Sequence, residues 1–94
     1  MEEELIKFLN SLSIDNEEIE GLIKLCPGLE IIDTERAITN VKLLVKAGYP
    51  LSDVSSIIYI NPGFLTNDPT ELSKTLIAIG DDLENKLNEN PFLI

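Results

Sequence analysis

The sequence predicts an all-α protein, a short helical-repeat array of five or six helices with proline-containing turns. Apolar residues recur at helical spacing through most of the 94 residues. The apolar run over residues 57–65 is interrupted by an Asn-Pro-Gly turn at Pro62. Similar interruptions at Pro27 and Pro91 indicate that one unit is repeated along the chain.

The spacing of these turns supports the repeat. Pro27 and Pro62 are 35 residues apart and Pro62 and Pro91 are 29 apart, lengths typical of helical repeats. In the first register Asp33 matches Asp68. Because units in such arrays bury their apolar faces only against neighbours, we expect one domain over residues 1–94. It contains about two and a half repeats after an N-terminal helix.

The first two helices are expected over residues 2–12 and 16–25. The first begins with three glutamates, whose negative charge is favourable at a helix N-terminus. Asp15 and Glu18 have the spacing of a capping box, and Ile14 and Ile19 that of a hydrophobic staple. Pro27 ends the second helix, and apolar residues at 29, 31 and 32 then cross the core as a short turn.

A third helix is expected over residues 34–47, capped by Asp33 and closed by Gly48 in a left-handed conformation. A fourth is expected over 53–60 with Ser52 as its cap. Residues 57–60 favour a strand equally well by propensity, but the cap and the repeat favour a helix.

The fifth helix has the clearest start in the chain: Asp68 as cap, Pro69 in the first position and Glu71 in the third, with Gly80 at its end. Asp81 and Glu84 repeat the capping box. They predict a last helix of about two turns that stops before Pro91.

This arrangement resembles a known family. A short helix, an N-P-x-[LF]-L turn and a helix ending in Leu-x-x-x-Gly, here at 44–48 and 76–80, are similar to the helical repeats of the mitochondrial transcription termination factors. The resemblance covers about residues 12–94. It implies nucleic-acid binding along a basic concave surface, and the residues that could correspond to basic positions of that groove are Arg36, Lys42, Lys46 and Lys74.

The charge favours a different class of partner. Seventeen acidic residues against seven basic ones give a formal charge of −10, which repels phosphate backbones and anionic membranes. Residues 36–52 nevertheless carry three cations and no acid. Lys42 and Lys46 share one helical face, whereas Arg36 lies on another.

Catalytic and cofactor chemistry are not indicated. The chain has no histidine, which excludes His-based acids, bases, triads and metal sites. Cys26, the single cysteine, is expected to be a small buried packing residue. The carboxylates occupy capping positions, and no P-loop, calcium loop or dinucleotide fingerprint occurs. We therefore expect no enzymatic activity, cofactor or metal, and a cytoplasmic location without membrane insertion, since no signal sequence is present.

The aromatic residues and the C-terminal segment suggest where contacts lie. Phe64 and Phe92 are read as equivalent core positions, and Tyr49 is expected to be partly exposed. No helix follows Pro91 in the sequence to cover the apolar residues after it. Either they dock on the chain's own core, or they form a homodimer contact through Phe92, Leu93 and Ile94. Both alternatives require a buried Phe92.

These observations favour a non-enzymatic interaction module that binds a protein partner through an apolar or acidic helical surface. Two alternatives stay open. One is a nucleic-acid binder in the manner of the resembled family, using the cations of residues 36–52. The other is an acidic antagonist whose carboxylates imitate phosphates.

Overall fold

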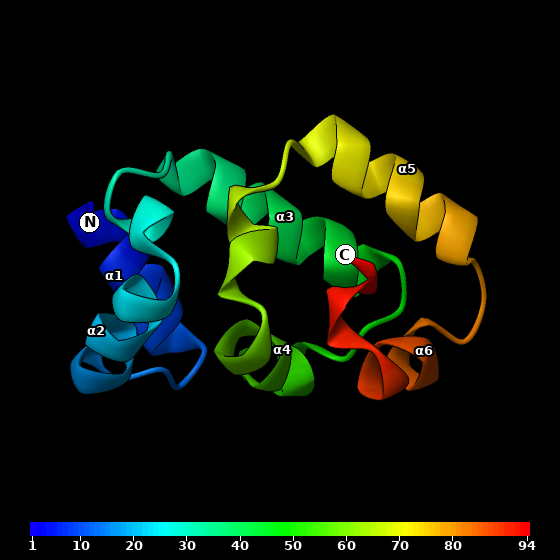
Figure 1. Ribbon diagram of the computed structural model, residues 1–94, viewed down its shortest axis with the longest axis horizontal. Helices are drawn as coiled ribbons and strands as arrows, with labels where there is room; N and C mark the ends of the chain where they lie inside the picture. Colours follow the sequence, from blue (N-terminus) through cyan, green and yellow to red (C-terminus); the bar gives the residue numbers. More distant parts are fainter.

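The computed structural model describes all 94 residues and contains six α helices, four short 3₁₀ helices and no strand (Figure 1). The all-α prediction is confirmed. The elements are α1 (Glu3–Ser11), α2 (Asn16–Leu25), η1 (Pro27–Glu30), α3 (Thr34–Lys46), η2 (Leu51–Asp53), α4 (Val54–Ile60), η3 (Pro62–Thr66), α5 (Pro69–Ile79), α6 (Leu83–Glu89) and η4 (Pro91–Leu93).

One order of elements recurs: an α helix, a proline-initiated 3₁₀ turn, then a second α helix. The order α2–η1–α3 is followed by α4–η3–α5, and α6–η4 begins the same order again. In Figure 1, α2, α4 and α6 form one row, α3 and α5 form the opposite side, and the proline-initiated turns η1, η3 and η4 lie between them. The molecule measures 34 × 22 × 20 Å. Its long axis runs from α1 and α2 to α6 (Figure 1).

Side-chain caps explain where three of the six α helices begin. The Asp15 carboxylate accepts from the backbone N–H of Glu18 at 2.8 Å, and the Glu18 side chain accepts from the N–H of Asp15 at 3.0 Å, which completes the predicted capping box. Asp33 and Asp68 each accept a bond of 3.1 Å from the backbone N–H two residues on. Pro69 occupies the first turn of α5, where its missing N–H costs nothing.

The start of α6 differs from the prediction of a capping box at Asp81 and Glu84. The N-cap is Asp82, with φ +65°, and its side chain caps no backbone N–H. Instead it accepts a bond of 2.8 Å from Asn85. Gly80, with φ +72°, and Asp82 both adopt positive φ, so the reversal after α5 takes one residue more than the pattern implies.

The start of α4 also differs. Residues 51–53 form η2, which runs directly into α4 at Val54, so Ser52 lies inside a 3₁₀ turn and is no cap. The helical assignment of residues 57–60, which a strand could have matched by propensity, is confirmed. Helix α3 ends at Lys46, one residue earlier than expected.

Tyr49 is buried, with 3% of its surface exposed, so the expectation of an exposed loop residue is wrong. The cause is the way α3 ends. The N–H of Gly48, with φ +111°, donates to Val45, and the N–H of Tyr49 donates to Leu44 at 3.2 Å. This is the Schellman pattern, in which the residue after the glycine packs back onto the last turn.

Two other packing expectations also fail. Cys26 is half-buried rather than buried, and it lies at the rim of a surface depression. Ile31 does not cross the core, because 89% of its surface is exposed. The core is a single cluster of twenty buried apolar residues that extends from α1 to α6.

One buried polar residue, Asn40 on α3, ties that helix to η3. Its side chain is fully buried, and its Nδ2 lies 2.9 Å from the carbonyl oxygen of Phe64, 3.3 Å from that of Leu65 and 2.8 Å from that of Asn67. The carbonyls of Phe64 and Leu65 belong to η3 and that of Asn67 directly follows it, and a 3₁₀ turn leaves some backbone acceptors without helical partners. Asn40 donates to all three, in addition to the backbone N–H of Asn67 that donates to Phe64 at 3.3 Å.

Candidate interaction surface

The four cations that the family resemblance points to differ in the groups that surround them. Arg36, Lys42 and Lys46 lie exposed along α3, and Lys74 lies exposed on α5. Arg36 donates to the carbonyl oxygen of Thr66 at 3.3 Å. Lys74 is 3.4 Å from Glu71 on its own helix.

Lys42 and Lys46 are different, since neither has a carboxylate oxygen within 4.0 Å. They are four residues apart on α3 and therefore project from the same face, one turn from each other. Two free ammonium groups thus lie on one side of a protein whose formal charge is −10.

Beside this face, α3 and α5 lie next to one another (Figure 1). Side chains of both helices line a groove of about 370 Å³. Four of its six lining residues are apolar, and Lys46 is the one charged residue among them. Ile77 has 78% of its surface exposed. The lining residues are Leu43, Lys46 and Ala47 from α3 and Ser73, Leu76 and Ile77 from α5.

The floor of the groove is formed where the two helices meet through their buried faces. Leu44 on α3 is fully buried, and Leu76 on α5 is 6% exposed at the bottom of the groove. Leu43 and Ile77 rise from this floor toward solvent. An apolar channel between two helices is the usual receptor for an amphipathic segment.

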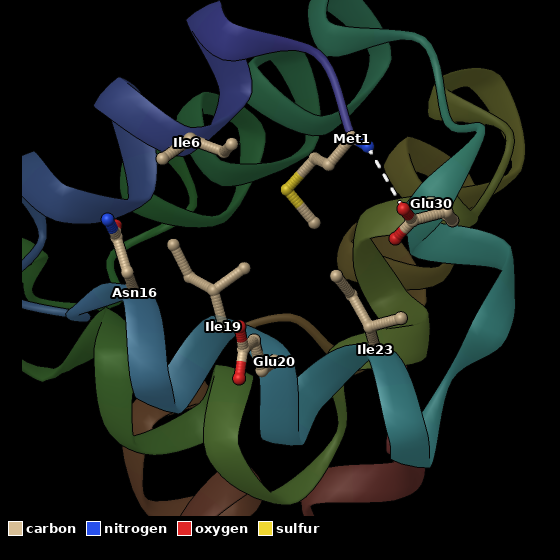
Figure 2. A pocket seen from close by; sticks show the side chains of 7 residues that line it. All are labelled: Met1, Ile6, Asn16, Ile19, Glu20, Ile23 and Glu30. Atoms are coloured by element: carbon tan, nitrogen blue, oxygen red, sulfur yellow. Dashed lines mark ion pairs between the residues drawn. The ribbon is translucent and has the colours of Figure 1, made fainter.

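A second depression lies at the other end of the molecule, between α1 and α2, and has a volume of about 310 Å³. Figure 2 shows the side chains of Met1, Ile6, Ile19 and Ile23 converging on it. The amino group of Met1 is 3.4 Å from a carboxylate oxygen of Glu30 at its edge.

The charge around this depression is strongly negative. Residues 1–35 hold ten acids and two lysines. Anionic ligands are therefore repelled from this end of the molecule and less so from the α3/α5 side.

The C-terminal turn η4 does not dock as predicted. Phe92 has 66% of its surface exposed and Leu93 41%, so the prediction that Phe92 is buried in the chain's own core is wrong. When Pro91 is aligned with Pro62, Phe92 takes the place of Gly63, and Leu93 takes that of the buried Phe64. Phe92 therefore occupies the solvent side of the turn.

Two asparagine side chains hold η4 against the preceding unit. Asn61 donates to the carbonyl oxygen of Pro91 at 3.0 Å, and Asn67 donates to that of Ile94 at 2.9 Å. Ile94 packs against the core. The turn is thus held through its backbone, and its two largest side chains remain exposed.

A tyrosine–carboxylate contact links the first unit to the second. Hydrogen bonding to the Glu18 carboxylate, with smaller contributions from burial and charge, raises the pKa of Tyr59 on α4 to about 12. The pKa of Glu18 is lowered, chiefly by the backbone N–H of Asp15 and then by Tyr59.

This contact predicts a measurable titration. The pKa of Tyr59, about 12, lies above the ordinary tyrosine value of 10.0, so its contribution to stability is complete below pH 10 and is lost as the pH rises through about 12. Tyrosinate absorbance should show a midpoint near pH 12 that moves toward 10 in Glu18→Gln, with Tyr59→Phe identifying the signal. A Tyr59 midpoint that is the same with and without Glu18 would contradict the contact.

Two further kinds of site would need a cluster of metal-ligating side chains or a membrane-spanning helix. No three Cys, Asp or Glu side chains converge to hold a metal ion. None of the helices combines the length and the apolar character needed to cross a bilayer.

Comparisons of the chain with models of protein families, with curated proteins and with solved structures find no match. The resemblance to the mitochondrial transcription termination factors therefore remains a prediction from the sequence.

Proposed function

We propose that this protein is a non-enzymatic helical-repeat interaction module that binds a segment of a protein partner in the groove between α3 and α5. The observation that carries the proposal is the composition of that groove. It has an apolar floor and an Ile77 that is 78% exposed, next to lysines that have no carboxylate partner.

The energetics favour a partner that covers Ile77. Burying an isoleucine side chain contributes about 1.5–3 kcal/mol, and Leu43 and Ala47 extend the same apolar strip. A segment that fills the groove would therefore gain affinity mainly from apolar contact. The lysines at its side would select which segment binds.

Nucleic-acid binding is the second candidate, and the free ammonium groups of Lys42 and Lys46 favour it. Two contacts contribute little, however, because the salt-dependent affinity grows with the number of phosphates neutralised. Arg36 and Lys74 already have partners within the protein.

The proposal is tested by titrating isotope-labelled protein with amphipathic helical peptides, and separately with mixed duplex DNA and single-stranded RNA. Amide signals of Leu43, Ala47, Ser73 and Ile77 should shift with peptide. Nucleic acid should bind weakly at physiological salt. Submicromolar, salt-sensitive binding of DNA or RNA, or peptide-induced shifts confined to other parts of the molecule, would refute the proposal.

A further inference from the structure

We infer that the segment recognised by this groove is an acidic amphipathic helix of another protein, with carboxylates spaced one turn apart beside its apolar stripe. The inference rests on the proposed function and specifies its partner. It follows from the charge of the groove, from the spacing between Lys46 in its lining and Lys42 one turn before it on α3, and from the burial of the chain's own acidic helices.

The charge at the groove is opposite to that of the protein as a whole. The residues that line the groove include Lys46 and no carboxylate. The chain from residue 36 to 52, which includes most of α3, carries cations only. On α5 the charges of Glu71 and Lys74 offset each other. A basic segment would be drawn to the acidic α1–α2 end, whereas an acidic one is favoured here.

The spacing of the lysines gives the register of the ligand. Lys42 and Lys46 are one helical turn apart, a rise of about 6 Å. A helix lying along the groove presents residues i and i+4 at the same separation. Glutamates at these positions could each approach one lysine while leucines at neighbouring positions cover Ile77 and Leu43.

A second copy of this chain does not suit the groove. Its acidic helix α1 has the right charge, but the apolar residues of that helix, Leu5 and Leu9, are fully buried in its own core. Ile19 and Leu22 of α2 are 4% and 3% exposed. The main apolar stripe of each acidic helix is therefore buried in its own fold, and the exposed Leu25 of α2 is a single residue outside that stripe, so a segment of another protein suits the groove better.

The inference is tested with three synthetic helical peptides of about four turns each. All three carry the same leucine stripe, and the flanking positions are glutamate in the first peptide, glutamine in the second and lysine in the third. The glutamate peptide should bind about tenfold more tightly than the glutamine peptide, the combined effect of two partly exposed ion pairs. This advantage should shrink as salt is added. The lysine peptide should bind least.

Variants assign the effect to the groove. Lys42→Gln with Lys46→Gln should abolish the preference for glutamate, and the matched control Lys7→Gln with Lys24→Gln, on α1 and α2 away from the groove, should keep it. Ile77→Ser should weaken all three peptides. Ile31→Ser, at a residue 89% exposed but outside the groove, is its control.

The outcomes separate the two proposals. Glutamine or lysine peptides that bind the groove as tightly as the glutamate peptide would overturn the inference and leave the proposed function standing. Binding of none of the peptides would overturn both. Concentration-dependent self-association that Ile77→Ser abolishes would identify a second copy as the occupant, and would also overturn the inference.

Discussion

Replacing Phe64 with alanine is expected to destabilise the protein by about 4 kcal/mol, the usual cost of a cavity left by a buried phenylalanine. Phe64 is fully buried in η3, which packs against α3, α4 and η1. The resulting cavity would lie where two repeat units meet. Denaturant unfolding followed by circular dichroism measures the loss.

Phe92→Ala is the matched control, because it removes the same side chain from the corresponding turn η4. With 66% of its surface exposed, Phe92 should contribute less than about 0.5 kcal/mol to the stability of the monomer. Similar losses for the two variants would show that Phe92 is buried, either in the fold or in a homodimer through Phe92, Leu93 and Ile94. Sedimentation of the wild type would tell these two apart.

Changing Asn40 to aspartate is expected to cost 3 kcal/mol or more, about the penalty for an uncompensated buried charge. The substitution removes the donor to the carbonyls of η3 and places a carboxylate against them. Asn40→Ala leaves the carbonyls unpaired without adding charge, so it should cost less, about 2 kcal/mol. Unfolding free energies of both variants, with exposed Asn88→Ala as control, measure these terms.

The free energy of unfolding of the Asn40→Asp variant should also depend on pH. Burial beside carbonyl oxygens raises the pKa of a carboxyl group above the ordinary value of about 4, so the deficit should be smallest below that pH and grow as the pH rises. Aspartate and alanine variants of equal stability at neutral pH would mean that this site is open to water.

What the sequence determined by itself is local. Helix starts at Asp15, Asp33 and Asp68 depend on hydrogen bonds that span two or three residues, and all three caps are present. The apolar spacing and the three proline turns likewise suffice to predict an all-α array. The shared face of Lys42 and Lys46 follows from helical geometry alone.

The burial of Tyr49 and the exposure of Phe92 were predicted wrongly, although the sequence contains a pattern that indicates each of them. Tyr49 directly follows the glycine that ends α3, and that position packs back onto the helix in a Schellman motif. Alignment of Pro91 with Pro62 puts Phe92 opposite Gly63, which already indicates a solvent-facing position. In both cases the register relative to Gly or Pro decided burial, more than the aromatic character of the residue.

Only the tertiary structure decided the rest. In the sequence, Asn40 looks like any other polar residue of a helix. Its role depends on the backbone carbonyls of η3, which lies more than twenty residues later in the chain and packs against α3. The groove likewise forms because α5 packs beside α3, which places Ile77 next to Lys46. These partners come from separate repeat units, and a pattern within one unit does not contain the contacts made between units.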